Sequence, residues 1–361
     1  MNITFLVGNG FDRNLGLHTA YSDFVKFYKT LTSESEYVNE FRTHIKENEE
    51  LWSSAEEALG QYTEHLEKGQ GLIFSECQAD FCEKLAQYLK LQERRINYAE
   101  HEEAIKQAFR KFENLTEPFA AVERSKISRV YQNYRQENIT FNFINYNYTY
   151  TLDNCLKIVE EFPGLLGSHR YSSSSYKHIV GTVCHVHGTV DGQMVFGVND
   201  DSQIAKLEVF EGNDGDLSKA LLIKKDANES YRENTDIKAA QILKSSTIIY
   251  IYGMALGITD KLWWERICEW LVASENRHLI LHQYEMPDAS VLPVQRLQFE
   301  RKVRRDFLKL GNLPDVKWKS VEDRIHVTSD NIFASIKNIA IPISAIPEDS
   351  CTNEKELASI G

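Results

Sequence analysis

The chain begins Met1-Asn-Ile-Thr-Phe-Leu-Val-Gly-Asn-Gly-Phe-Asp12, an apolar run that leads directly into a Gly-x-Gly turn. Such a run is typical of a first buried strand with a tight turn at its carboxyl end. Gly8 and Gly10 would let the backbone approach a phosphate closely, because glycine has no Cβ and adopts backbone angles closed to other residues. The full dinucleotide-binding pattern has a third glycine three residues later, where this chain has Arg13. The stretch therefore predicts a strand followed by either a phosphate-approaching turn or an ordinary strand-to-loop turn.

Composition places the chain among ordinary globular proteins. Its 361 residues are 42% hydrophobic and 26% charged, enough for one large domain or two smaller ones. The net charge of −12 argues against a broad nucleic-acid-binding surface. The basic cluster within residues 301–305 is expected to be a solvated helix face.

The sequence also indicates a compartment. No apolar stretch approaches the ~18 residues of a membrane span, and we expect neither a membrane partner nor a secretory leader. Six cysteines occur without a Cys-x-x-Cys pair, so neither a zinc site nor a disulfide framework is indicated. We therefore predict a cytoplasmic protein without a bound metal.

A long helical stretch separates the first strand from the other predicted strands. Apolar residues recur at helical spacing over residues 19–137, where Pro118 is the single proline. Because the first strand needs partners from the later half, we predict an α/β core with a helical insertion rather than a separate N-terminal domain. The predicted units are the core (1–18 and 138–340), an all-helical insertion (19–137) and a polar C-terminal tail (341–361).

Buried strands alternating with helices in the later half predict a parallel sheet. Strands are expected at residues 139–144, 178–180, 183–186, 194–196, 247–252, 278–282 and 324–327. Helices are expected at residues 261–273 and 331–340.

Polar and glycine residues follow four of the predicted strands. They stand in segments 8–12, 145–149, 185–188 and 253–260. Because ligands of open α/β sheets bind beyond the carboxyl ends of the strands, we expect these four segments to meet at one site.

These segments resemble the AbiH abortive-infection family, which acts in defence against phage. The resemblance covers the first strand to about residue 285. It is carried, in the family's order, by segments 8–12 with 16–24, 52–60, 147–153, His187-Gly188, and the Gly253 loop with Asp260.

The same landmarks resemble, more distantly, the sirtuin-like NAD-binding proteins. This implies a Rossmann-type parallel sheet in which Gly8 and Gly10 hold the pyrophosphate. It further implies that Asn147 binds the nicotinamide ribose, that His187 of the His-Gly188 pair is catalytic, and that the Gly253 loop receives the adenosine side. Asn9, Asp12 and Thr149, which adjoin these positions, are predicted to contact the ligand as well.

The chain departs from the sirtuin pattern at three points. Thr149 stands where sirtuins have Asp, Ala255 stands where both groups commonly have Ser, and the four-cysteine zinc module is missing. Protein deacylation is therefore in doubt. The functions that remain are cleavage of NAD⁺ by water and binding of a ligand without reaction.

The side chains suit cleavage of the nicotinamide–ribose bond. His187 would act as the base, because its pKa lies near ~6.5 when unperturbed. Asn147 would orient the water or the carboxamide. His185 is the rival base. Glu56 on the helical insertion could reach the site, but we rather expect it to face solvent or to cap a helix, and we expect Asp260 to cap the 261–273 helix.

Two other functions stay open at this stage. The protein could bind a nucleotide as a signal while the helical insertion contacts a protein partner or trigger, and it could self-associate. It could also be a metal-dependent nuclease using Asp12, Glu56 and Asp260, although these do not form a clustered carboxylate motif and the acidic charge discourages nucleic acid.

Overall fold

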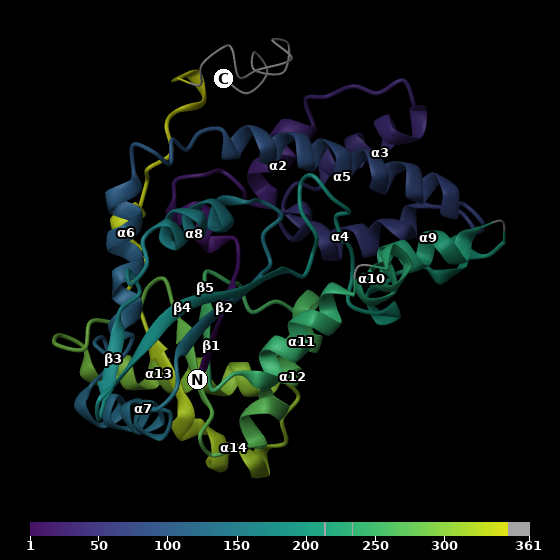
Figure 1. Cartoon of the computed structure of the whole chain (residues 1–361). Coiled ribbons are helices and arrows are strands. Elements are labelled where there is room, and N and C mark those ends of the chain that lie inside the picture. The colour runs from purple at the N-terminus through teal and green to yellow at the C-terminus, as the bar shows by residue number, and fades with distance from the viewer. Residues whose placement is uncertain (213, 233, 346–361) are drawn as a thin grey trace.

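A twisted sheet of seven strands forms the centre of the computed structural model, which describes residues 1–212, 214–232 and 234–345 (Figure 1). The order across the sheet is β3-β4-β2-β1-β5-β6-β7. β3 is antiparallel to β4, and the other neighbouring pairs are parallel. The strands are β1 (Asn2–Val7), β2 (Ile139–Asn145), β3 (Ser168–Tyr171), β4 (Ser174–His185), β5 (Ile248–Tyr252), β6 (His278–His282) and β7 (Ile325–Thr328).

The parallel strands follow a doubly wound topology. Numbered by themselves in chain order, they lie in the order 3-2-1-4-5-6, which is that of dinucleotide-binding sheets. The order reverses between β1 and β5, so the switch point lies where these two strands end. The predicted α/β class, the mostly parallel sheet and the helical stretch after β1 are confirmed.

β1 is buried on both faces because it lies in the middle of the sheet. Successive side chains of a strand point to opposite faces. Phe5 and Val7 accordingly belong to one apolar core, and Leu6 belongs to another on the opposite face. The apolar run that opens the chain is therefore the run that a central parallel strand requires.

The helical stretch between β1 and β2 divides between two cores. The side chains of α2 to α5 form a core of their own together with residues such as Val198 and Leu222. α6 and α7 instead pack on the sheet, for example through Phe109 and Val130. The helices of this stretch are α1 (Gly10–Asn14), α2 (Tyr21–Tyr28), α3 (Glu36–Glu47), α4 (Ala55–Tyr62), α5 (Gly71–Glu93), α6 (Glu102–Arg110) and α7 (Ala121–Asn133).

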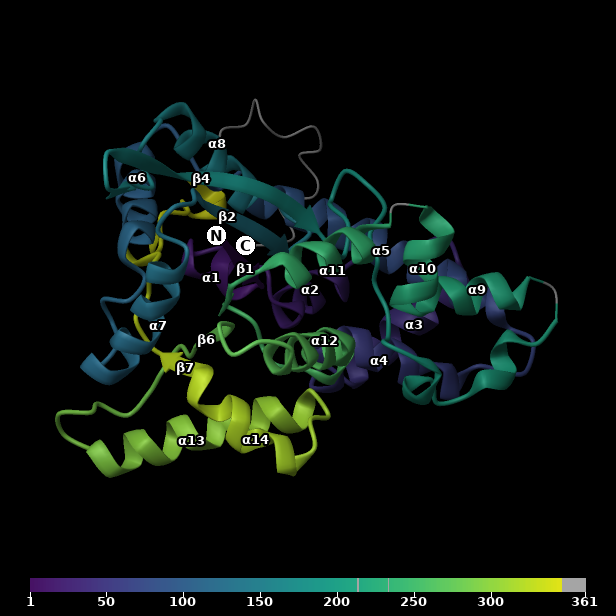
Figure 2. The same cartoon turned by 60° about the horizontal axis from the view of Figure 1, so that its bottom comes forward.

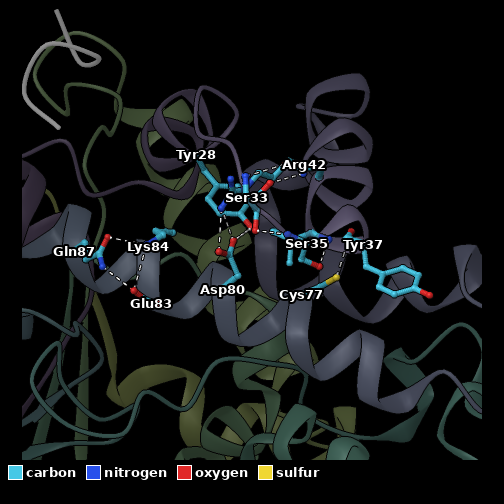
Figure 3. A network of polar contacts seen from close by, with 12 residues as sticks. Tyr28, Ser33, Ser35, Tyr37, Arg42, Cys77, Asp80, Glu83, Lys84 and Gln87 are labelled. Atoms are coloured by element: carbon cyan, nitrogen blue, oxygen red, sulfur yellow. Dashed lines mark hydrogen bonds and ion pairs between the residues drawn. The ribbon is translucent and has the colours of Figure 1, made fainter. Parts of the chain in front are cut away.

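A buried ion pair joins the helices of this second core (Figure 3). Arg42 on α3 donates from Nη2 to both carboxylate oxygens of Asp80 on α5, at 3.0 and 2.8 Å. The hydroxyl of Tyr28 on α2 donates to the same carboxylate, and the Arg42 guanidinium lies 4.8 Å from the centre of the Tyr28 ring. Three helices are thereby held together around one charged centre.

The second half of the chain covers the other face of the sheet. α11 to α14 contribute to the core around Leu6, whereas α8 packs with α6 on the first face (Figures 1 and 2). Among the described residues, no helix is both long and apolar enough to cross a bilayer. The helices of this half are α8 (Thr151–Glu161), α9 (Gly215–Leu222), α10 (Lys224–Tyr231), α11 (Thr235–Ser245), α12 (Lys261–Val272), α13 (Pro293–Leu310) and α14 (Asp315–Val321).

Two predicted elements are wrong. Residues 194–196 form no strand, because the Val195 N–H donates to the carbonyl of His187 and the Phe196 carbonyl accepts from Gln78. Residues 331–340 contain only the short turn Ala334–Ile336, because the N–H groups of residues 338 and 340 donate to carbonyls of residues 14 and 15 instead of continuing a helix. Of the predicted C-terminal tail, residues 346–361 lie outside the described part of the chain.

Candidate functional site

The strand register brings the four predicted segments to the carboxyl edge of the sheet. Val7 at the end of β1 lies opposite Asn145 of β2 and Tyr252 of β5. Asn145 in turn lies opposite His185 of β4. The glycine turn, the 145–149 segment, the His187 segment and the Gly253 loop therefore all leave the sheet at one edge.

The glycine turn packs directly against the loop that follows β5. Gly8 and Gly10 donate from their N–H groups to the carbonyls of Tyr252 and Gly253, at 3.0 and 2.7 Å. A Cβ on Gly10 would lie 2.4 Å from the Cα of Gly253, which itself has a φ of +65°. The glycines are thus required by the contact between the two loops at the switch point, and their role toward a ligand stays a prediction.

Asp12 is the centre of a buried hydrogen-bond network. Its carboxylate accepts from the hydroxyls of Thr149, at 2.7 Å, and Thr151. Asn147 donates from Nδ2 to the Gly8 carbonyl at 3.2 Å and reaches Asp12 at 3.5 Å. Burial raises the pKa of Asp12 to about 6, against the opposing effect of the two threonine hydroxyls. The network joins the end of β1 to the end of β2.

Two further predicted residues shape the local backbone. Asn9 donates from its side-chain amide to the Thr19 carbonyl and accepts from the Thr19 hydroxyl, which ties the turn to the start of the helical stretch. Gly188 has a φ of +75°, and a Cβ there would lie 1.7 Å from the carbonyl oxygen of Gln193. Glycine is therefore required at the turn that follows His187.

His185, the rival base, is engaged at both ring nitrogens. Nδ1 lies 3.0 Å from the Asn147 carbonyl oxygen, and Nε2 lies 3.0 Å from a carboxylate oxygen of Asp153. Burial alone would lower its pKa, but Asp153 outweighs burial, and the pKa of His185 is raised above its ordinary value. With an acceptor at each nitrogen, the protonated ring is favoured, and both of its N–H groups are used to hold the Asn147 segment and Asp153 in place.

His187 lies in a different environment. Its Nε2 is 3.4 Å from Oδ1 of Asp260 in the segment before α12, and the edge of the ring meets Tyr146, with 5.3 Å between the ring centres. The side chain is only 8% exposed. His187 and Asp260, which are 73 positions apart by their numbers, thus form a buried histidine–carboxylate pair at the sheet edge.

A buried lysine completes this part of the site. Nζ of Lys224 on α10 lies 2.8 Å from Oε2 of Glu56 on α4, 3.1 Å from Oδ1 of Asp260, and 3.3 Å from the Thr259 carbonyl oxygen. Burial would lower the pKa of Lys224, but the two carboxylates raise it. Burial would likewise raise the pKa of Asp260, but Lys224 and then His187 lower it well below its ordinary value. Both groups are therefore charged at neutral pH.

The sequence prediction missed the centre of this cluster. Lys224 belongs to no motif, and its two acidic partners stand 168 and 36 positions away. Glu56 is 8% exposed and bound to Lys224, so the expected solvent-facing role is wrong. Asp260 does precede α12, but its side chain makes no capping hydrogen bond and turns to Lys224 and His187 instead.

A further acid, which is half-buried, was also missed. Glu93 at the end of α5 accepts from the Tyr150 N–H at 2.5 Å. Burial is the main reason that its pKa is raised to about 7, and the nearby carboxylates of Asp12, Asp191 and Asp153 add to the rise. The edge of the sheet thus carries two carboxyl groups that change protonation near neutral pH.

Two buried donors at the end of β2 have no protein partner among the described residues. They are Nδ2 of Asn145 and the hydroxyl of Tyr146, which is the residue that meets His187. Leaving such a group unsatisfied costs about 1 to 3 kcal/mol, so water or a polar ligand is expected there. No group of three or more His, Cys, Asp and Glu side chains suited to a metal occurs within the described ranges.

The fold and site define a class: a doubly wound α/β protein with a buried, charged, histidine-containing site at the switch edge of its sheet. The chain belongs to the bacteriophage abortive infection AbiH family, whose model matches residues 4–282. The match extends from β1 to the end of β6. No curated protein and no solved structure shows significant similarity to the chain. Membership of the AbiH family makes this chain a phage-defence protein.

Proposed function

We propose that this protein binds NAD⁺ at the carboxyl edge of its sheet and hydrolyses it to nicotinamide and ADP-ribose. The observation that carries the proposal is the buried His187–Asp260 pair, which lies beside the unpartnered hydroxyl of Tyr146. A paired histidine beside unsatisfied donors at the switch edge of a doubly wound sheet is the arrangement that a nucleotide-cleaving site needs.

The proposed reaction consumes one water. The bond between the ribose C1′ and the nicotinamide nitrogen breaks, and its electron pair neutralises the positive charge of the pyridinium ring. A water oxygen bonds to C1′ and gives a proton to His187. With Nε2 of His187 lying 3.4 Å from Asp260, we assign Nδ1 as the nitrogen that accepts the proton. A general base of this kind typically contributes ~10² to 10⁴ in rate.

Asn147 and Asp12 would position the sugar and the water. Because Nδ2 of Asn147 is engaged by the Gly8 carbonyl, its Oδ1 is the atom that would accept a hydrogen bond from the attacking water. Thr149 replaces the sirtuin Asp, yet its hydroxyl donates to the Asp12 carboxylate at 2.7 Å. Asp12 would thereby supply the negative charge near the developing positive charge of the ribose.

The test is release of nicotinamide from NAD⁺ by the purified full-length protein, followed by chromatography. We expect His187→Ala to reduce release at least 100-fold, within the range for loss of a general base. His65→Ala, which removes an exposed histidine in the helical stretch, is the matched control and should retain full activity. Full turnover by His187→Ala, or no turnover by the wild type in any activated state, would overturn the proposal.

A second candidate is NAD⁺ or nucleotide binding without cleavage. It is favoured by the side chains of Asn147 and Thr149, whose donors are already engaged by Gly8 and Asp12. Calorimetry separates the two functions. Tight NAD⁺ binding by the wild type with no release of nicotinamide supports the binding function alone.

A further inference from the structure

A cavity of about 340 Å³ lies at the opposite, amino end of the sheet. It is bordered by Met1 and Ile139, which stand at the starts of β1 and β2. Six residue steps of β2 separate Ile139 from Asn145, which places the cavity about 20 Å from the carboxyl edge at the ~3.3 Å rise of a strand. It is therefore separate from the site described above.

Aromatic and cationic side chains form the walls of this cavity. The end of α7 and the residues after it supply Tyr131, Tyr134 and Arg135, and the neighbouring edge strand β3 supplies Arg170 and Tyr171 (Figure 1). The guanidinium of Arg135 lies 4.4 Å from the centre of the Tyr171 ring. Such walls suit a planar ligand that stacks on aromatic rings.

The charge of the cavity favours an anion. No ion pair or side-chain hydrogen bond holds the guanidinium of Arg135 or Arg170 among the described residues, and His169 also lines the cavity. Glu113 is the carboxylate that also lines it. Two guanidinium groups without an ion pair among the described residues, against one carboxylate, leave a positive balance in a chain whose net charge is −12.

Tyr131, one of the residues that line the cavity, carries a buried hydroxyl without a partner among the described residues. The hydroxyl of Tyr131 is inaccessible to solvent and makes no hydrogen bond with the described part of the chain. Burial raises its pKa, so the hydroxyl keeps its proton and remains a donor. Because this hydroxyl is inaccessible to solvent, it lies behind the cavity surface and is not a contact for a ligand in the cavity.

We propose that this cavity binds the phosphate-bearing unit of a nucleotide, with the base against the tyrosine rings and the phosphate on Arg135 and Arg170. The volume lies at the lower end of the ~300 to 1,000 Å³ range of small-molecule sites, which fits one nucleotide better than a dinucleotide. The unit comes either from a free mononucleotide or from the 5′-phosphorylated end of a single strand. This binding site does not depend on the NAD⁺ hydrolysis proposed above.

Calorimetry of the full-length protein with adenosine monophosphate tests the proposal. We expect Arg135→Glu and Arg170→Glu each to weaken binding at least tenfold, and Tyr131→Phe, which removes a hydroxyl that does not face the cavity, to leave binding unchanged. The matched control is Arg129→Glu, which changes an exposed arginine on α7 outside the cavity and should leave binding unchanged. Adenosine, which lacks the phosphate, should bind at least tenfold more weakly than adenosine monophosphate.

Two further binding measurements show where the bound nucleotide comes from and whether it binds in this cavity or at the carboxyl edge of the sheet. A 5′-phosphorylated oligonucleotide that binds more tightly than the mononucleotide identifies a strand end, and the reverse identifies the free nucleotide. His187→Ala should bind adenosine monophosphate as the wild type does. The proposal is overturned if the wild type does not bind, if both arginine variants bind as tightly as the wild type, or if only His187→Ala loses binding, whatever the outcome of the nicotinamide assay.

Discussion

Replacing Lys224 by methionine would leave the buried carboxylates of Glu56 and Asp260 without the ammonium group that bridges them. Methionine keeps the length and the packing of the aliphatic stem. Because removing one partner strands the charge of the other, breaking a buried pair costs about 3 to 5 kcal/mol. For a chain of 361 residues, this loss corresponds to a decrease of about 4 to 7 °C in Tm.

The loss should depend on pH in a defined direction. The pKa of Asp260 is lowered in the folded state, mainly because Lys224 and His187 outweigh burial. The pair therefore stabilises the fold above the ordinary pKa of an Asp side chain, and this stability disappears as the pH falls through the lowered folded value. The difference between wild type and Lys224→Met should be large at pH 7 and smaller near pH 3, where carboxylates take up protons.

Thermal unfolding followed by circular dichroism checks this prediction. The double variant Lys224→Met/Glu56→Gln removes one of the two stranded charges and should recover part of the lost Tm. Lys225→Met, at the neighbouring position of α10, is the control and should change Tm by less than about 1 °C, as surface substitutions usually do. A Tm of Lys224→Met equal to that of the wild type at pH 7 would refute the reasoning about the buried charges.

Two other substitutions test the switch edge. Gly10→Ala places a Cβ 2.4 Å from the Cα of Gly253. It should destabilise the fold by about 1 to 3 kcal/mol in urea titrations, whereas Gly257→Ala, with its nearest atom at 3.8 Å, should be nearly neutral. Asp12→Asn should gain stability relative to the wild type as the pH rises from 3 to 8. The folded pKa of Asp12 is raised from 3.8 to about 6 by burial, so ionisation favours the unfolded wild type by up to about 3 kcal/mol. A constant difference between the two proteins across this range would contradict the assignment.

The sheet was predictable because its signals are local. A parallel strand buried on both faces requires an apolar run, and the glycines or polar residues that follow such a run mark its carboxyl end. Parallel strands share that end, so the meeting of the Gly8, Asn147 and His187 segments follows from the strand pattern. Residues 331–340 have apolar residues at helical spacing but form no such helix. The N–H groups of residues 338 and 340 donate instead to carbonyl groups at the end of α1.

The charged cluster could not be predicted in the same way. Lys224 stands beside a second lysine in a polar helix, and nothing in that local pattern distinguishes the buried side chain from the exposed one. Asp260 precedes a helix, as a capping residue does, yet its carboxylate contacts Lys224 and lies 3.4 Å from Nε2 of His187. Burial of a charge depends on partners that the fold brings from distant segments, and a single sequence does not mark those partners.

The position of β1 also bears on how the chain is made. Its two neighbours in the sheet, β2 and β5, begin at residues 139 and 248. At ~5 to 20 residues per second, β2 leaves the ribosome roughly 7 to 26 seconds after β1. Throughout that interval the newly made chain carries an apolar strand with no partner on either edge, a typical site of aggregation and of chaperone binding. Any fragment that stops before residue 139 would keep that strand exposed permanently, so nascent and truncated chains should be far more prone to aggregation than the finished protein.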